Sequence, residues 1–312
     1  MMNKTILAAG VGTLLFSPIV SAEMTWYGKA HLAIVNADPD SGDSELDLVS
    51  NASRLGVKGM TKISDDLSAV YKMEFDVDLD GEGDDFFNAR NLYAGLKGSF
   101  GTLFGGRHDT PVKQLEGKID LFGDTVADFG NVFDFYVDSQ ERENRFLGYD
   151  SPDMSGFKFK AATMPGKEAD AELGDAYSLS LTYGDPKMKK TPFYVGVGYD
   201  DEVDGKDTSV VRLAASVKFG DIGLGTILEN ADDGDDDQTR YMFSAYYKIG
   251  HGKIKGQYVY GDDVGSKDES DLWALGYEHD IGGGTSVYAF YAERDLGGEE
   301  VDFTSVGFIY KF

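Results

Sequence analysis

The chain has 312 residues and carries 55 acidic against 29 basic side chains, which gives a formal net charge of −26. Nucleic-acid phosphates would repel so acidic a chain, and we therefore exclude nucleic acid as a partner. The sequence has no cysteine and only four histidines, which show no metal-ligand spacing. We accordingly expect no disulfide, no thiolate chemistry, no metal site and no cofactor.

The first 22 residues are typical of an export signal. One lysine, Lys4, precedes an apolar stretch at residues 6–20, and small residues follow at Ser21 and Ala22. The stretch is short of the roughly 20 apolar residues that a membrane-spanning helix needs. We expect cleavage after Ala22 and a single mature domain at residues 23–312.

Downstream, about sixteen stretches of roughly ten residues alternate between apolar and small or charged side chains. They lie near residues 24, 51, 67, 87, 102, 144, 156, 175, 192, 208, 222, 238, 253, 271, 285 and 302. In residues 208–220, for example, Val211 and Leu213 alternate with Arg212 and Ala214. A period of two residues predicts β-strands with one apolar and one polar face.

Short turns alternate with longer acidic loops between these strands. Turns 64–66 and 250–252 contrast with loops 80–86 and 262–270. Short turns at one end and long loops at the other are typical of outer-membrane barrels. A soluble sandwich also alternates, but the bases on the polar faces could not be buried in its dry core. We therefore predict an all-β fold, a transmembrane antiparallel β-barrel of about 16 strands that is wide enough to hold water.

Aromatic residues near the predicted strand ends lie on the outward parity, where they could form girdles at the bilayer interfaces. They are Trp26, Trp273, Tyr277, Phe308, Tyr310 and Phe312. The parity of the stretch near residue 285 is ambiguous, because either Tyr288 with Phe290 or Val287 with Tyr291 could point outward.

The longest connection, residues 108–143, interrupts the strand pattern for about 36 residues. Loops of that length are usually functional or disordered. This loop contains many apolar residues, Leu115, Ile119, Phe122 and Phe129 among them, which is atypical of disorder. We expect it to fold back against the protein.

Four parts of the sequence carry a resemblance to a known family. They are Trp26-Tyr27-Gly28-Lys29-Ala30; Ala52-Ser53-Arg54-Leu55-Gly56-Val57-Lys58-Gly59; residues 88–107 with Tyr93-Ala94-Gly95-Leu96; and Arg142-Glu143-Asn144 followed by Tyr149-Asp150-Ser151-Pro152. Together with the final Phe312 they resemble the general trimeric porins of Gram-negative outer membranes, over the whole mature chain. The resemblance implies a sixteen-stranded barrel, a homotrimer among outer-membrane lipid and lipopolysaccharide, and a last strand read by the barrel-assembly machinery through Phe312.

The resemblance also implies that the third loop folds into the lumen as a constriction, where its acids face bases on the wall. The constriction acids would be Glu116, Asp120, Asp124 and Asp128, and the wall bases Lys29, Arg54, Lys58, Arg90, Arg107 and Arg142. Alternation alone places Arg54 and Lys58 on one face of their strand. Asn144-Arg145 departs from the small polar pair often seen after the loop in the family.

These features predict a passive, water-filled channel for small hydrophilic solutes and ions, with no catalytic residue. The acidic loop and mouth predict a mild preference for cations. Six bases expected to face inward act in the opposite direction: Lys158, Lys160, Arg212, Lys218, Lys253 and Lys255.

Other interpretations stay open. A substrate-selective channel would depend on a few lumen side chains that sequence cannot position, and a barrel enzyme or an adhesin is a weaker hypothesis because no catalytic arrangement can be placed. The acidic segments 80–85 and 232–237 are either solvated loop tips or divalent-cation sites that bridge to lipopolysaccharide, although they match no calcium-loop spacing. An acidic surface adapted to salt is a further reading.

Overall fold

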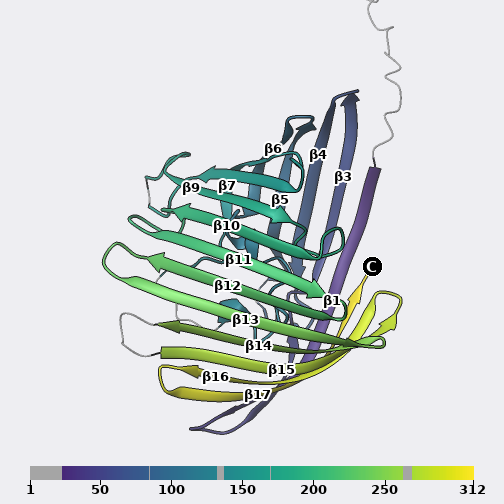
Figure 1. The fold of residues 1–312 in the computed structure, drawn as a ribbon, viewed down its shortest axis with the longest axis vertical. Coiled ribbons are helices and arrows are strands. Elements are labelled where there is room, and N and C mark those ends of the chain that lie inside the picture. Colours follow the sequence, from purple (N-terminus) through teal and green to yellow (C-terminus); the bar gives the residue numbers. More distant parts are fainter. Residues whose placement is uncertain (1–22, 84, 132–136, 169, 263–268) are drawn as a thin grey trace, which may run out of the picture.

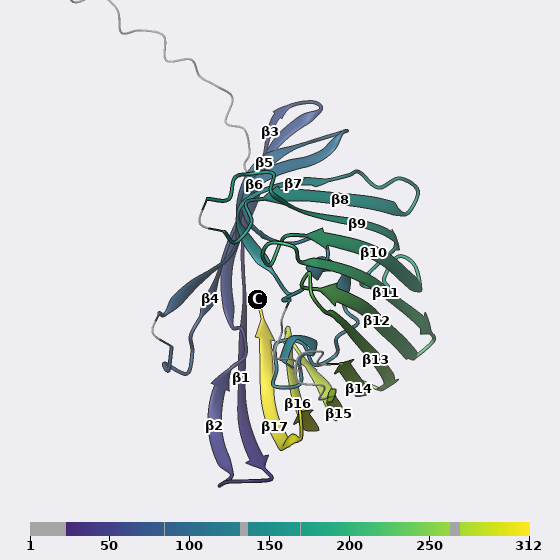
Figure 2. The same ribbon diagram turned by 90° about the vertical axis from the view of Figure 1, so that its left-hand side faces the viewer.

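The computed structural model describes residues 23–83, 85–131, 137–168, 170–262 and 269–312, so the expected export signal lies outside the described residues. Antiparallel strands wrap around a central space in Figures 1 and 2. Among the described residues, no helix is both long and apolar enough to cross a membrane.

The strands of the described ranges form one antiparallel sheet in which, apart from β2 and β3, each strand pairs with its neighbours along the chain. They are β1 (Glu23–Pro39), β2 (Glu45–Ser50), β3 (Arg54–Ser64), β4 (Leu67–Val77), β5 (Phe87–Gly98), β6 (Gly101–Asp109), β7 (Arg142–Asp150), β8 (Phe157–Met164), β9 (Ala176–Gly184), β10 (Phe193–Asp201), β11 (Ser209–Phe219), β12 (Ile222–Asp232), β13 (Asp237–Ile249), β14 (Gly252–Asp262), β15 (Glu269–Gly282), β16 (Thr285–Leu296) and β17 (Glu299–Lys311). Two short 3-10 helices, η1 (Lys113–Glu116) and η2 (Phe129–Asn131), lie in the connection between β6 and β7.

β2 and β3 together occupy a single position in the wall. Both pair with β1, β3 along residues 23–29 and β2 along residues 32–37. The break between them falls at Ala52, whose φ of 45° lies in the left-handed region and turns the chain out of the extended conformation. β1 also pairs with β17 from Lys29 opposite Lys311 to Pro39 opposite Val301, which closes the ring. The barrel therefore has sixteen strand positions, and the predicted fold is confirmed.

The two faces of the strands differ as the alternation predicts. In β11, Val211 and Leu213 are 47% and 44% exposed on the outside, whereas Arg212 and Ala214 are fully buried on the inside. The ambiguous stretch near residue 285 is resolved in the same way: Val287 is exposed, and its neighbour Tyr288 is buried and points inward. The outer face thus carries the apolar side chains, which lipid can solvate.

The connections divide the barrel into two unlike ends. One end carries the start of β1 at Glu23, the end of β17 and tight hairpin turns such as those at Gly220 and Gly250, where φ is 60° and 57°. Longer connections lie at the opposite end. The long connection predicted at 108–143 is two residues shorter at each end and covers 110–141, because His108 and Asp109 still pair with Glu143 and Arg142 of β7. In bacterial barrels the short-turn end faces the periplasm.

The 110–141 connection packs against the inward-facing side chains of the wall. Its apolar residues Leu115, Ile119 and Phe122 are each 1% exposed and belong to the largest buried apolar cluster of the described residues. Glycine on the wall makes this close approach possible, since a Cβ at Gly225 would lie 2.8 Å from a side-chain methyl of Ile119. The apolar anchors of the sequence are therefore what holds this segment to the barrel.

Candidate functional site

The main cavity of the described residues has a volume of about 1240 Å³ and lies between the wall and the 110–141 connection. Its lining contains thirteen bases and six acids. The bases are Lys29, Arg54, Arg90, Lys113, Lys118, Arg142, Lys158, Lys160, Lys187, Lys248, Lys253, Lys255 and Lys311, and the acids are Asp109, Glu116, Asp120, Asp124, Asp128 and Glu278. The lining is thus net positive, whereas the chain as a whole is strongly negative.

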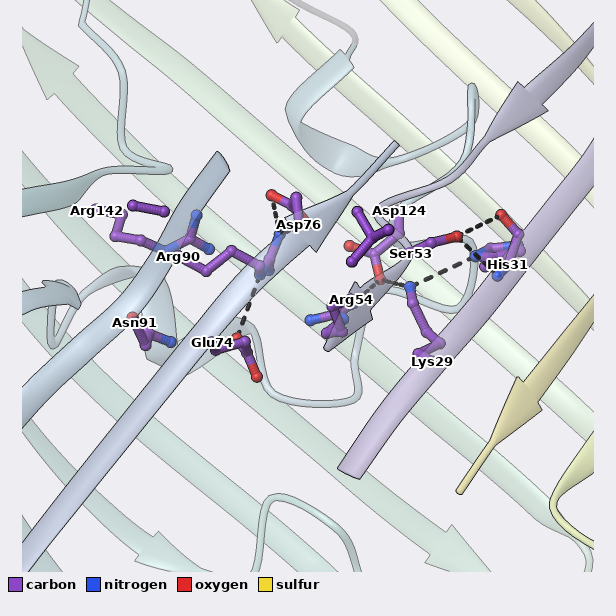
Figure 3. Close-up of polar contacts among 12 residues, drawn as sticks. Lys29, His31, Ser53, Arg54, Glu74, Asp76, Arg90, Asn91, Asp124 and Arg142 are labelled. Atoms are coloured by element: carbon purple, nitrogen blue, oxygen red, sulfur yellow. Dashed lines mark hydrogen bonds and ion pairs between the residues drawn. The ribbon is translucent and has the colours of Figure 1, made fainter. Parts of the chain in front are cut away.

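Asp124 is the loop acid that meets the wall. Its Oδ2 lies 2.6 Å from Nζ of Lys29 on β1 and 2.6 Å from Nη2 of Arg54 on β3, two residues that are directly opposite in the sheet register. Figure 3 shows both side chains converging on the carboxylate. Burial works to raise the pKa of Asp124, but the charges of Arg54 and Lys29 outweigh it and hold the pKa at about 2. Asp124 therefore stays ionised and cross-links the loop to two strands.

The backbone at Asp124 is left-handed, with φ of 64°. Aspartate tolerates this conformation better than most residues because its short side chain can bond locally. The N–H of Asp124 donates to Oδ2 of Asp128 at 2.6 Å, which fixes the turn. This geometry points the Asp124 carboxylate toward the bases instead of back into the loop.

The other three predicted acids also line the cavity, and two of them accept hydrogen bonds from the loop's own backbone. Asp120 accepts the N–H groups of Phe122 and Phe129, and Asp128 accepts those of Asp124 and Gly130. Burial, reinforced by the nearby carboxylates, raises the pKa of Asp120 and of Asp128. Burial and then the charge of Asp128 raise the pKa of Glu116 to about 7. Asp120 and Asp128 thus fix the loop's backbone, and within the described ranges none of the three acids makes an ion pair with a wall base.

Arg90 and Arg142 continue the row of wall bases, as Figure 3 shows. Arg90 lies 2.9 Å from Asp76 and 3.2 Å from Glu74, both on β4. Arg142 lies 2.8 Å from Asp109 at the end of β6. The structure thus pairs these two bases with wall acids that the sequence analysis did not single out. Alternation could have placed Glu74 and Asp76 on the inner face of β4, because Phe75 lies between them on the other face.

The remaining two predicted wall bases stand apart from the cavity lining. Lys58 shares the inward face of β3, and its Nζ lies 5.2 Å from the ring centre of Tyr27. Arg107 is opposite Leu92 in the register, on the face that Leu103 shares, so it points away from the lumen. Its Nε donates to the carbonyl of Ala89 at 3.2 Å. Neither base contacts the loop acids.

Comparison with known proteins places this barrel in a family. A family model described as Gram-negative porin matches residues 6–298. The chain belongs to the Gram-negative porin family. The major outer membrane protein P.IB of Neisseria gonorrhoeae is 24% identical over an alignment of 331 positions, which covers 92% of each sequence.

Solved structures give the same fold. The anion-selective porin from Comamonas acidovorans superposes on this porin with a TM-score of 0.81 at 23% identity, over 93% of this chain and 100% of that one. OmpT, an outer membrane protein of Vibrio cholerae, in its trimer form gives a TM-score of 0.69 at 19% identity, over 93% and 99%. These likenesses agree with the predicted family and barrel.

A buried charge network anchors the far end of the porin's loop. Arg212 and Arg240 flank Glu229, at 2.6 Å and 3.0 Å, and all three side chains have no exposed area. Arg212 also donates to Oγ of Ser139 at 2.7 Å, and Arg240 donates to the carbonyl of Val137 at 2.8 Å. Of the six bases expected to face inward, Arg212 is therefore a structural residue and not part of the cavity lining.

Four other expected inward bases line the porin's cavity, namely Lys158, Lys160, Lys253 and Lys255, whereas Lys218 does not. Lys113, Lys118 and Lys187 also line the cavity, and sequence alone could not place them because they lie in connections, where alternation gives no parity. Lys248 and Lys311, on the inward parity of β13 and β17, complete the lining. In the acidic loops, carboxylates accept hydrogen bonds from the backbone of the same loop: Asp78 from Gly81 and Gly83, and Asp233 from Asp236. A divalent-cation site at the tips stays a prediction.

Proposed function

We propose that this porin is a passive outer-membrane channel for small hydrophilic solutes and ions, and that its 110–141 connection forms the constriction. The observation that carries this proposal is the bridge from Asp124 to Lys29 and Arg54, which joins the connection to the wall beside a charged cavity. Polar lining lets hydrated solutes avoid the cost of entering hydrocarbon, so transport needs no energy source and no catalytic group.

The channel favours anions. Thirteen bases against six acids line the cavity, and three of those acids have raised pKa values. Ions near the narrowest part lie within the ~8 Å screening length of these charges, so the lining outweighs the more distant acidic loops. This replaces the cation preference expected from composition. The anion-selective relative from Comamonas acidovorans supports the same sign.

The test is the reversal potential of the purified porin in a planar bilayer under a potassium chloride gradient. We expect stepwise channel insertion and a potential of the sign set by chloride. A potential set by potassium would refute anion preference, and absence of conductance would refute the channel itself. Conductance that saturates with one solute would favour a substrate-selective channel instead.

We further propose that the mature chain begins after Ala22 and forms a homotrimer surrounded by outer-membrane lipid and lipopolysaccharide. The barrel-assembly machinery would recognise the last strand through Phe312. The trimer form of the Vibrio cholerae relative supports the oligomer. Exposed apolar side chains on β1 and β2, such as Ile34, Leu46 and Leu48, give an outer face that can pack against a second copy. Intact mass and unheated gel electrophoresis of outer-membrane preparations test both points.

A further inference from the structure

One group of lysines in the cavity lies apart from the constriction. We call Lys118, Lys187, Lys248, Lys253 and Lys311 the short-turn lysines. Lys187 belongs to the β9–β10 turn, Lys248 and Lys253 flank the β13–β14 turn, and Lys311 ends β17, all at the short-turn end of the barrel. Lys118 comes to this end from the loop, because Gly117 packs on the same β9–β10 turn: a Cβ there would lie 3.2 Å from Cβ of Pro186. All five line the same cavity.

These lysines have little compensating charge. Within the part of the chain that the structure describes, no ion pair within 4.0 Å is made by Lys118, Lys187, Lys248 or Lys311. Lys253 lies 3.2 Å from Glu278, but that carboxylate is shared with Lys255 at 3.4 Å. Among the described residues, Glu278 is therefore the acid that makes an ion pair within this group, and Asp124 acts on Lys118 only at longer range.

The sheet register brings like charges face to face here. Lys248 is directly opposite Lys253, and Lys311 is directly opposite Lys29. Such cross-strand pairs are destabilising unless something neutralises them. Desolvation inside the barrel, followed by the repulsion of Lys311, lowers the pKa of Lys118, with Asp124 opposing and Lys187 adding to the shift. Lys118 is thus repelled by lysines of two other elements, Lys311 and Lys187.

We propose that the short-turn lysines form a binding site for a multivalent oxyanion, one with two or more negative charges, at the periplasmic side of the cavity. The inference rests on the proposed channel function and names the class of solute it retains. Lysine presents a compact point charge without the planar fork of arginine, so a group made of lysine alone selects charge density more than shape. A bound oxyanion would also relieve the repulsion between the facing pairs.

The test measures channel block in a planar bilayer held in potassium chloride. Inorganic pyrophosphate and citrate, added separately, distinguish a phosphate from a carboxylate ligand, and acetate serves as the monovalent comparison. We expect pyrophosphate or citrate, but not acetate, to reduce conductance with saturation, and more strongly from the short-turn side. Lys248→Gln should raise the half-blocking concentration by about threefold, the effect expected for a double charge held about 6 Å from one ammonium ion at physiological salt.

Lys206→Gln is the matched control, because Lys206 is 69% exposed in the loop after β10 and lies outside the cavity lining. It should leave the half-blocking concentration unchanged. The double variant Lys248→Gln, Lys253→Gln should weaken block further, and its conductance in chloride alone shows that it has assembled. Absence of saturable block by either multivalent anion in a channel that still prefers chloride would overturn this site and leave the proposed function intact. Equal weakening by Lys206→Gln would also overturn it.

Discussion

Replacing Asp124 with asparagine removes the one loop carboxylate that bridges to the wall while keeping the loop's shape. Asparagine tolerates the left-handed φ of 64° as aspartate does, and the backbone bond to Asp128 is unaffected. The variant therefore leaves Lys29 and Arg54 in place but without their shared counter-charge. Because the turn is kept, a change in ion selectivity reports the lost charge, and the loss of anchoring is limited to the two ion pairs of Asp124.

The magnitude follows from distance. An ion about 6 Å from a unit charge in water interacts with it by about 0.7 kcal/mol, and screening at physiological salt about halves this value. Because the sign is opposite for cation and anion, removing Asp124 changes their free-energy difference by about 0.7 kcal/mol. We expect Asp124→Asn to raise the permeability ratio of chloride to potassium by roughly threefold.

Loop anchoring should weaken as well. The pKa of Asp124 is about 2 instead of its ordinary 3.8, which corresponds to about 2 kcal/mol in favour of the charged carboxylate. A third of the side chain is exposed, so screening reduces this contribution to about 1 kcal/mol. Since the pKa is depressed, the stabilisation is present above pH 3.8 and is lost as the pH falls through about 2.

Reversal potentials of the wild type and of Asp124→Asn, measured in the same chloride gradient at pH 6, provide the assay. Asp65→Asn is the matched control, because Asp65 is 96% exposed in the β3–β4 turn and lies outside the cavity lining. The control should keep the wild-type potential. An unchanged potential in Asp124→Asn, or a shift toward potassium, would refute the role assigned to this residue.

Two further predictions concern the loop. Glu229→Gln should destabilise the folded porin by about 3 kcal/mol, because Arg212 and Arg240 stay buried beside a neutral side chain. Gel electrophoresis of samples heated to a series of temperatures should show a lower unfolding temperature, and an unchanged temperature would contradict the prediction. Burial raises the pKa of Glu116 from 4.5 to about 7. The neutral carboxyl therefore stabilises the fold fully below pH 4.5, and this stabilisation is lost as the pH rises through about 7 and the carboxyl becomes charged. Chloride preference should therefore fall between pH 5 and pH 8. Glu116→Gln should reduce this dependence in reversal-potential measurements and leave the part due to Asp120 and Asp128, and an unchanged dependence would contradict the role of Glu116.

Much of the barrel could be read from single residues and their neighbours. The period of two places Arg212 and Ala214 on one face of β11 and Val211 on the other, because side chains of a strand point alternately to its two sides. The apolar residues of the long connection, such as Ile119, likewise required burial and found it. These features are local consequences of composition and spacing, so no tertiary information was needed.

Which of the predicted site residues meet one another could not be read from alternation, because it depends on the tertiary geometry of the long connection. Glu116, Asp120, Asp124 and Asp128 are equivalent acids in the sequence, and only the left-handed turn and the internal hydrogen bonds direct Asp124 to the wall. For Arg107, the alternation of β6 and the family resemblance disagree, and its register opposite an outward leucine decides the matter.

Composition and residue spacing are enough to establish strands with two unlike faces, a long connection held by apolar residues and a large negative charge. The charge that a permeating ion meets depends on the folded barrel, because closing the ring gathers lysines from distant turns into one cavity while most acids lie outside its lining. Electrostatic interaction falls with distance and is screened within about 8 Å, so the arrangement of charges around the lumen, and not their total, sets the field inside.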